Sequence, residues 1–348
     1  MNEFLRSHDD DVFAAGKLPY DVLTSLLSTF DHSPEVVLGP GIGHDVAIVD
    51  TGMPEHYLVL KSDPITFATE RLGWYAVTVC ANDLATVGAD PRWYLATILL
   101  PTQRSDAALI RTIMDDLQHA AREVGAVIVG GHTEVTDVPR AIVSGTMIGM
   151  VRRDAVVWPN GLRVGDTIVL TGGMAIESTS IVARELPDRL RATGFTEHDI
   201  ATAAEYLVRP GIGVTLVSRV ARGAGRIRAM HDPTEGGVVT ALDELAAASG
   251  VGISVDTATL NAAISPLSQR VCDAVGIDPR GAISSGAMLI GLASDDAKRV
   301  TDALRRVGID AWTVATVVEG APGCRPADDG SEWPRFAVDE IARLFHGN

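Results

Sequence analysis

Cysteine is scarce in this chain. Its 348 residues include Cys80, Cys272 and Cys324, which lie far apart and form no CxxC pair. A disulfide framework needs an even set of cysteines at short spacings, and a zinc knuckle needs paired ones. The sequence therefore excludes both kinds of small cross-linked domain.

Positive charge and long apolar runs are also in short supply. The 29 Lys and Arg residues against 45 Asp and Glu residues give a formal net charge of -16. Nucleic acids and anionic membranes require a basic surface, so we expect neither as a partner. The apolar runs are shorter than the roughly 20 residues that cross a bilayer, and the polar start MNEFLRSHDDD lacks the features of a signal peptide. We expect a cytoplasmic protein, in which a phosphate ligand needs a metal ion or focused Lys and Arg groups.

Three common catalytic signatures are missing as well. The chain has no GxxxxGK[ST] phosphate loop, no HExxH zinc motif and no GxSxG nucleophile motif. The GxG elements at 41–43 and 211–213 lack the spacing and the strand-to-helix setting of a dinucleotide fingerprint. Any nucleotide chemistry must therefore use a different kind of site.

Length and apolar content are sufficient for two domains. A chain of 348 residues with 46% hydrophobic residues exceeds one ordinary core. We predict an N-terminal domain at 1–155, a C-terminal domain at 156–325 and a tail at 326–348. The boundary falls in RRDAVVWPNGLRVGD, which has turn chemistry at its Pro-Asn-Gly.

Hydrophobic periodicity predicts an α+β fold for both halves. In the first half we expect, in chain order, a helix at about 17–30, the strands DVAIV and HYLVLKS, a helix at 71–88, the strand RWYLATILLP, a helix at about 104–124, and the strands AVIVGG and AIVSGTMIGMV. This order is typical of a mixed sheet with its helices on one face. In the second half we expect the strand DTIVLTGG, a helix containing IESTSIVARE, helices at about 196–208, 211–223 and 235–249, the strand GISVD, the apolar run AISSGAMLIGLA, a helix at 294–307 and the strand TVATVVEG.

The segment MHDPTEGG, at 230–237, is the most informative motif. It places the carboxylate of Asp232 and the glycines Gly236 and Gly237 just before a strongly helical run. A carboxylate beside backbone that can approach a phosphate closely indicates nucleotide chemistry. The alternative is an ordinary helix start, in which Asp or Thr caps free N–H groups and the glycines ease packing.

Three further carboxylates, those of Asp45, Asp63 and Asp83, occur at predicted strand ends or on a helix face. Loops on a rigid scaffold can bring such positions together. With Asp232 they predict a Mg²⁺ site, because hard cations prefer oxygen ligands and would supply the positive charge that a nucleotide requires. Taken singly, each has a plainer explanation: a turn residue, a residue before proline, and a helix residue on a solvated face.

Lys61 and His132 are weaker candidates. Lys61 lies close to Asp63 and would neutralise a phosphate, although a surface lysine at a strand end explains it equally well. His132 follows Gly130 and Gly131 in GGHTEV, where its imidazole would contact phosphate or act as an acid or base. A hydrogen-bonded turn histidine is the competing explanation.

An ordered set of segments resembles a known superfamily. The segments are GIGHDVAIVD, LKSDPIT, ANDLATVGADP, GGHTEV, DTIVLTGG, HDPTEGGV and SSGAMLI. In order and spacing, over about residues 35–320, they are similar to the superfamily of aminoimidazole ribonucleotide (AIR) synthetase, selenophosphate synthetase, thiamine-monophosphate kinase and the hydrogenase-maturation carbamoyl dehydratase. The likeness is greatest to the hydrogenase-maturation branch. The resemblance implies ATP and Mg²⁺ in a cleft and an N-terminal domain that pairs with its twin, forming a β-barrel in a homodimer.

The resemblance also implies roles for particular residues. Asp45, Asp63 and Asp83 would hold Mg²⁺ and the ATP phosphates, and Asp232 would reach the same site from the second domain. Further cofactor-binding positions would be Asn82, Gly130, Gly131, Gly236 and Gly237. Lys61, a candidate from its place close to Asp63, is added to them. The catalytic candidates are Asp83, His132 and Asp232, with His132 where relatives have a polar or acidic residue beside the nucleotide.

Departures from the family pattern narrow the expected reaction. His44 stands where many relatives have the first of two neighbouring acids, and Glu235 stands where carbamoyl dehydratases often have Arg. The chain ends in LFHGN, without the terminal cysteine that receives the carbamoyl group, and Cys324 is a poor substitute. The thiocarbamate reaction is therefore disfavoured. Selenophosphate synthesis is disfavoured too, because no cysteine lies near the N-terminus.

We therefore expect an ATP- and Mg²⁺-dependent enzyme that transfers a phosphoryl group to an oxygen of a small substrate, such as an amide or a carbonyl compound. One alternative is a small-metabolite kinase of the thiamine-monophosphate kinase type. Another is a non-catalytic, nucleotide-binding maturation or assembly protein.

Overall fold

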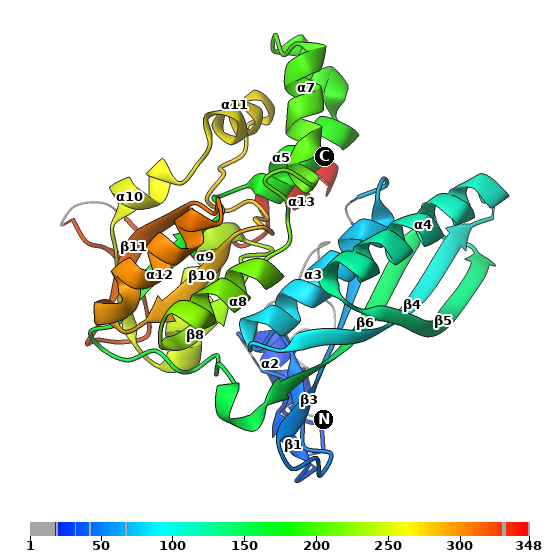
Figure 1. The fold of residues 1–348 in the computed structure, drawn as a ribbon. Coiled ribbons are helices and arrows are strands. Elements are labelled where there is room, and N and C mark those ends of the chain that lie inside the picture. Colours follow the sequence, from blue (N-terminus) through cyan, green and yellow to red (C-terminus); the bar gives the residue numbers. More distant parts are fainter. Residues whose placement is uncertain are drawn as a thin grey trace.

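The computed structural model describes most of the chain and shows two domains, each built on a six-stranded sheet (Figure 1). The described residues are 18, 20–31, 33–41, 43–66, 68–102, 104–328 and 332–346. Within them, no helix combines the length and apolar character that a membrane span requires.

The N-terminal domain follows the predicted order of strands and helices. Its elements are α2 (Tyr20–Leu27), β1 (Val36–Leu38), β2 (Ala47–Val49), β3 (His56–Ile65), α3 (Leu72–Thr86), β4 (Asp90–Pro101), α4 (Ala107–Val124), β5 (Val127–Thr136) and β6 (Ile142–Arg152). The strands pair in the order β1-β2-β3-β6-β4-β5, and only the β4–β5 pair is parallel. The predicted mixed sheet is confirmed, with the short strand β1 added at one edge.

One face of this sheet is covered by helices. Along β6, buried residues alternate with half-buried ones, and Val143, Met147 and Val151 share a core with α3. Figure 1 shows α3 and α4 lying over the same face of the sheet. A Cβ at Gly73 would lie 2.5 Å from the carbonyl oxygen of Ile113, so glycine allows these two helices to pack closely. The other face of the sheet has no helical cover among the described residues of this domain.

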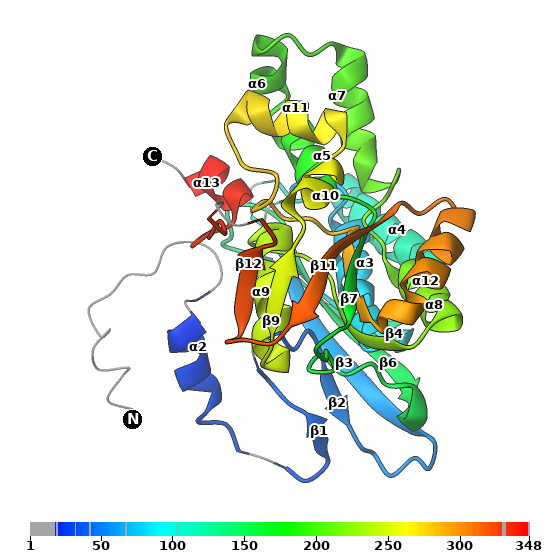
Figure 2. The same ribbon diagram turned by 90° about the vertical axis from the view of Figure 1, so that its left-hand side faces the viewer.

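The 3₁₀ turn η1 (Arg153–Ala155) follows β6 and is bonded to the N-terminal domain. The C-terminal domain is also α+β, as predicted. Its elements are β7 (Thr167–Thr171), α5 (Ile176–Glu185), α6 (Pro187–Ala192), α7 (Glu197–Ala204), the 3₁₀ turn η2 (Glu205–Leu207), α8 (Thr215–Ala224), β8 (Ile227–His231), α9 (Gly237–Ser249), β9 (Gly252–Val255), α10 (Thr257–Ala262), α11 (Pro266–Val275), β10 (Met288–Leu292), α12 (Ser294–Arg306), β11 (Ala311–Val318), β12 (Gly323–Pro326) and α13 (Glu340–His346). The strand order is β12-β9-β11-β7-β10-β8, and Figure 2 shows β12, β9, β11 and β7 side by side.

Helices cover both faces of this second sheet. Every residue of β7 is buried, and successive side chains point to opposite faces. Ile168 and Leu170 belong to a core with α9, whereas Val169 belongs to another core with α8 and α12. A strand that is buried on both faces has apolar residues at nearly every position, which explains the sequence TIVLT.

Helix α3 connects the two domains. All of its residues are buried, and it contacts α4, β3 and β6 on one side and α8 and β8 on the other. The amide of Asn82 donates to the carbonyl oxygen of Ile212 at 2.7 Å and accepts from the N–H of Val214 at 2.8 Å. The hydroxyl of Ser218 on α8 donates to the carbonyl oxygen of Ala85. The C-terminal end of α3 is therefore fixed against the second domain, and Asp83 lies beside this contact.

The segment predicted as a tail packs against the second domain. Ile341 and Ala342 of α13 are buried. The carboxylate of Asp339 accepts hydrogen bonds from the backbone N–H groups of Gly236 and Ile341, both at 2.7 Å. The end of the chain therefore supports the turn that follows β8.

Candidate active site

An acidic cluster forms where β3 and α3 meet the end of β8. We use this name for Asp45, Asp63, Asp83 and Asp232. Asp63 lies on β3, Asp83 on α3, Asp45 just before β2 and Asp232 directly after β8. Two domains thus contribute carboxylates to one place, as the sequence predicted for these four residues.

The position of Lys61 follows from strand alternation. Residues two apart on a strand share a face, and Val59 and Ile65 of β3 are buried in the core that contains α3. Lys61 and Asp63 share that face. The Nζ atom of Lys61 lies 3.4 Å from Oδ2 of Asp83 and 3.7 Å from Oδ2 of Asp63. Lys61 is therefore a member of the cluster and not an isolated surface lysine.

The carboxylates of the cluster shift the pKa of Lys61. Burial lowers the pKa of Lys61, but the carboxylates of Asp83, Asp63, Asp45 and Asp232 outweigh this effect and raise its pKa above the ordinary value. Lys61 is held in its charged form, and it faces more than one carboxylate.

Asp83 is the most central carboxylate. It is 3% exposed, which excludes the alternative of a helix residue on a solvated face. Burial raises its pKa well above the ordinary value, the neighbouring carboxylates of Asp232 and Asp45 add to this, and Lys61 opposes it. One lysine does not compensate the negative charge that is concentrated here.

Asp232 provides the most direct indication of a cation site. It is 1% exposed, and neither of its carboxylate oxygens has a hydrogen-bond partner among the described residues. Burial, followed by the charge of Asp45, raises its pKa to about 8. A buried carboxylate without a partner costs folding free energy, and a bound cation removes that cost. The oxygen donors of the cluster fit Mg²⁺, which prefers carboxylate ligands and keeps some waters.

A buried histidine orients one of these carboxylates. Nδ1 of His231 lies 2.9 Å from Oδ2 of Asp45, and its Nε2 lies 2.7 Å from Oε2 of Glu244. Burial lowers the pKa of His231, but Asp45 and Glu244 raise it by more, so the charged imidazole donates to both. One ligand atom each of Asp45, His231 and Asp232 lies within 4.8 Å of the others. Because both ring nitrogens are already engaged, His231 is better suited to fixing Asp45 than to binding a metal.

The roles of His231 and Glu244 were not predicted from the sequence. His231 was visible only as a member of the MHDPTEGG motif. Glu244 lies seven residues after Gly237, which is about two helical turns. The two residues therefore lie on the same face of α9. That spacing is the signal that could have indicated it.

His132 and its neighbouring glycines lie apart from the cluster. They are on β5, which β6 and β4 separate from β3. The His132 side chain is 66% exposed and lies 3.3 Å from Oε2 of Glu134. A Cβ at Gly131 would lie 1.9 Å from the carbonyl oxygen of Ala96 on β4, so its missing side chain allows close strand packing. The roles predicted for Gly130, Gly131 and His132 toward a nucleotide stay predictions.

The glycines after Asp232 have backbone reasons of their own. Gly236 and Gly237 have φ angles of 83° and 64°, and a Cβ at Gly237 would lie 2.4 Å from the carbonyl oxygen of Arg280. These values require glycine in the turn that starts α9.

His44 is turned toward the backbone, with Nδ1 2.9 Å from the carbonyl oxygen of Gly39. Asn82, for its part, uses both ends of its amide in the contact between domains.

Comparisons with known proteins identify the family of this chain. Two family models match the chain: "AIR synthase related protein, N-terminal domain" over residues 43–151 and "AIR synthase related protein, C-terminal domain" over residues 163–323. The carbamoyl dehydratase HypE of Cupriavidus necator is 28% identical over 265 residues, which cover 74% of this chain and 70% of that protein.

Two solved structures share the fold. One is the hydrogenase maturation protein HypE in complex with ATP, with a TM-score of 0.68 and 20% identity, covering 92% of this chain and 96% of that one. The other is AaThiL complexed with AMPPCP and TMP, also with a TM-score of 0.68 and 20% identity, covering 91% and 95%. Both have the same two-domain α+β architecture as this chain.

Proposed function

Because this chain belongs to the AIR synthase related proteins, we propose that it is an ATP- and Mg²⁺-dependent enzyme that phosphorylates, and so activates, an oxygen of a small substrate. An amide or carbonyl oxygen is the preferred acceptor. The relative named carbamoyl dehydratase and the neighbours crystallised with ATP or AMPPCP support ATP-dependent activation.

The observation that carries the proposal is the acidic cluster around Lys61, with both oxygens of Asp232 unpartnered. Asp45, Asp83 and Asp232 would hold Mg²⁺, with Asp63 at the edge of the site. The bound ion would neutralise and orient the phosphates of the nucleotide.

The other side chains would supply position and charge. The ammonium group of Lys61 is held near the carboxylates and would contact a phosphate oxygen. The hydrogen bonds from Glu244 through His231 would keep Asp45 in one orientation. Preorganised charge of this kind is the main contribution that proteins make to phosphoryl transfer.

The proposed reaction balances without a further reactant. The acceptor oxygen forms a bond to the γ-phosphorus of ATP, the bond from that phosphorus to the bridging oxygen breaks, and ADP leaves with that oxygen. For a primary amide, one N–H proton passes to solvent and an O-phosphorylated imidate remains. Its C–O bond then breaks readily in an elimination or substitution, with phosphate as the leaving group.

A homodimer is part of the proposal. Strand β5 is the last strand of its sheet and exposes Val127, Val129 and Val135, each by more than half of its surface. An apolar edge strand is a surface that a second copy would cover. Such pairing would also give exposed His132 new neighbours, which its proposed role beside a nucleotide requires.

Calorimetric titration with a non-hydrolysable ATP analogue tests the site. We expect Mg²⁺-dependent binding to the wild type and its loss in Asp83→Asn, which changes the charge and keeps the shape. Asp115→Asn is the matched control, because Asp115 lies on the exposed side of α4. Circular dichroism should show that all three proteins are folded.

The outcomes separate the hypotheses. Unchanged Mg²⁺-dependent binding by Asp83→Asn would refute the metal assignment. Binding without turnover of ATP in the presence of any acceptor would instead favour the non-catalytic assembly protein. The structural likeness to AaThiL keeps a small-metabolite kinase as the second candidate activity.

A further inference from the structure

A groove runs between helices α8 and α12 of the second domain, which lie side by side in Figures 1 and 2. Its volume is about 570 Å³, which is within the range of pockets that hold small molecules. The charged residues of its lining are Arg222, Arg299 and Arg306, and the described lining includes no Asp or Glu. The groove is therefore a local concentration of positive charge in a chain whose formal net charge is -16.

Arg222 connects this groove to a second cavity. That cavity has a volume of about 290 Å³, is lined mainly by the N-terminal domain, and has Arg222 in common with the groove. Its lining contains two further arginines, a histidine and the carboxylate of Asp90. A Cβ at Gly88 would lie 3.1 Å from Cδ of Arg222, so glycine leaves room for the arginine to reach the N-terminal domain.

The guanidinium group of Arg222 is poorly compensated. Its side chain is half-buried, and no described residue accepts a hydrogen bond from its enclosed Nε. Burial lowers the pKa of Arg222, the charge of Asp90 opposes this, and the charge of Arg219 adds to it. Asp90 is itself paired with Arg219, at 3.6 Å between Oδ1 and Nη2. Because a buried charge without a partner is costly, an anion at the outer nitrogens of Arg222 would stabilise this region.

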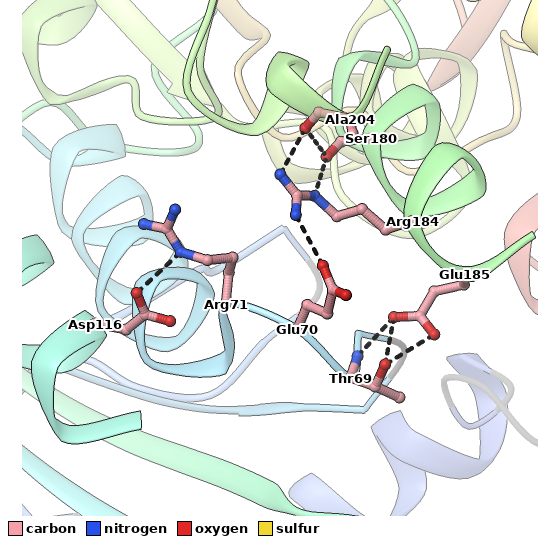
Figure 3. A network of polar contacts seen from close by, with 8 residues as sticks. All are labelled: Thr69, Glu70, Arg71, Asp116, Ser180, Arg184, Glu185 and Ala204. Carbon is pink, nitrogen blue, oxygen red and sulfur yellow. Dashed lines mark hydrogen bonds and ion pairs between the residues drawn. The ribbon is translucent and has the colours of Figure 1, made fainter. Parts of the chain in front are cut away.

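Another arginine at the domain boundary has a full set of partners. Figure 3 shows Arg184 of α5, with its Nη1 3.0 Å from Oε2 of Glu70. Its Nη2 donates to the carbonyl oxygen of Ala204 at 2.9 Å, and its Nε donates to Oγ of Ser180 at 3.3 Å. Arg222 differs from this pattern, which indicates that its partner is not part of the chain.

Capping of helix C-termini is a simpler explanation for arginines at this place, because positive charge is stabilising there. It accounts for Arg299, whose Nε donates to the carbonyl oxygen of Ala224 at the end of α8. Arg306 makes no hydrogen bond or ion pair within the described part of the chain, and Asp302, one turn before it, is bonded to Lys298 at 2.6 Å. Helix capping therefore explains only one of the three arginines of the groove.

The chemistry of the groove favours a phosphate group. Guanidinium groups bind phosphate oxygens well, because they stay charged and present several N–H donors in one plane. A monocarboxylate brings one negative charge to two unengaged guanidinium groups, whereas a phosphate monoester brings about two near neutral pH. Glycine, alanine and valine residues form the rest of the lining and suit an uncharged body attached to the phosphate.

We propose that the groove between α8 and α12 is a second anion site, separate from the acidic cluster, and that it binds a phosphorylated small molecule through Arg222 and Arg306. The outer nitrogens of Arg222 would contact the phosphate, and Arg306 would supply the second positive charge. The cluster gathers carboxylates that suit a cation, whereas the groove offers guanidinium groups that suit an anion. The proposal does not depend on the reaction proposed above.

Calorimetric titration with inorganic pyrophosphate in the presence of EDTA tests the site. EDTA removes divalent ions, so the carboxylates of the acidic cluster repel this probe. The proteins would be the wild type, Arg222→Gln, Arg306→Gln and the control Arg111→Gln, because Arg111 is exposed on α4. Acetate and hexaglutamate would be titrated under the same conditions, at about 0.15 M salt to screen weak surface attraction.

We expect the wild type and Arg111→Gln to bind pyrophosphate at one site, at least tenfold more tightly than acetate. Arg222→Gln and Arg306→Gln should each weaken pyrophosphate binding at least tenfold, because each removes charged donors. Arg306 is exposed, so its replacement tests the groove without disturbing the packing of the helices. Mg²⁺-dependent binding of the ATP analogue, measured separately, should be the same in all four proteins.

No binding of pyrophosphate by the wild type, or unchanged binding in Arg306→Gln, would overturn the proposal. A parallel loss of Mg²⁺-dependent nucleotide binding in both groove variants would place the anion in the active site and would overturn it as well. Tighter binding of hexaglutamate than of pyrophosphate would replace the small molecule with an acidic segment of a partner protein. Absence of nucleotide binding by the wild type, with pyrophosphate binding intact, would refute the proposed function and leave the groove assignment standing.

Discussion

Replacing Glu177 with glutamine should stabilise the folded protein at alkaline pH and change little at acid pH. The side chain is 4% exposed, and burial raises its pKa from 4.5 to about 7. Hydrogen bonding from Ser285 opposes this rise, and the carboxyls of Glu235 and Asp339 add to it. A difference of this size between folded and unfolded states corresponds to about 3 kcal/mol once the group is fully ionised.

The sign follows from the direction of the shift. The folded pKa lies above the unfolded one, so the folded protein binds this proton more tightly. The cost is absent below pH 4.5, where the carboxyl is protonated in both states, and it grows until the pH passes about 7. Glutamine carries no such cost. Between pH 5 and pH 8, the stability of Glu177→Gln relative to the wild type should therefore rise by about 2 kcal/mol.

Urea unfolding of the wild type, Glu177→Gln and Glu123→Gln at both pH values measures this difference. Glu235 and Asp339 titrate in all three proteins, so most of their contribution cancels. Glu123→Gln should change by less than about 0.5 kcal/mol between the two pH values, because Glu123 is exposed and its ion pair with His119 lies at the surface. A gain that is equal at both pH values, or one that grows toward acid pH, would refute the reasoning that Glu177 is buried with a raised pKa.

Two further predictions concern the contacts between elements and between copies. Asn82→Ala should lower the free energy of unfolding by about 1–3 kcal/mol, because the buried carbonyl of Ile212 and N–H of Val214 lose their partner; a loss below about 0.5 kcal/mol in urea titration would contradict that role. Val129→Arg should convert a dimer to a folded monomer in analytical ultracentrifugation, and a monomeric wild type would refute the proposed pairing through β5.

The fold was largely predictable because most of its elements have a clear hydrophobic period. The helix predicted at 71–88 is α3, Leu72–Thr86, and the strand predicted as HYLVLKS lies within β3. β8 was not predicted, since IRAMH is short and mixes apolar residues with charged ones, and its neighbours supply most of its burial. Short elements that depend on tertiary packing carry little local signal.

The carboxylates of the site could be predicted because they occur in motifs with a recognisable order. Contacts between a side chain and distant backbone groups could not be predicted. Asp45, Asp63, Asp83 and Asp232 were found from the order of their motifs, and the structure places them together. Nothing in the sequence indicates that the partners of Asn82 are a carbonyl and an N–H group more than a hundred residues away, because backbone groups have no residue signature.

The glycines of GGHTEV illustrate the same limit. Their sequence predicts a close approach of backbone, and a close approach is what the structure shows at Gly131. Its neighbour, however, is the carbonyl oxygen of Ala96 on β4. A glycine therefore predicts that another group packs closely against the backbone. Which group this is depends on the strand topology, which the glycine does not indicate.

The cluster and Glu177 show two ways in which this fold can carry buried negative charge. In the cluster, Asp83 and Asp232 are buried in excess over Lys61, so that part of the protein is most stable with a bound cation. Glu177 is buried elsewhere at the domain boundary, and its pKa of about 7 lets protonation remove part of its charge near neutral pH. Added Mg²⁺ should therefore stabilise the folded protein through the cluster and leave the pH-dependent cost at Glu177 unchanged, because only the cluster gathers several carboxylates in one place.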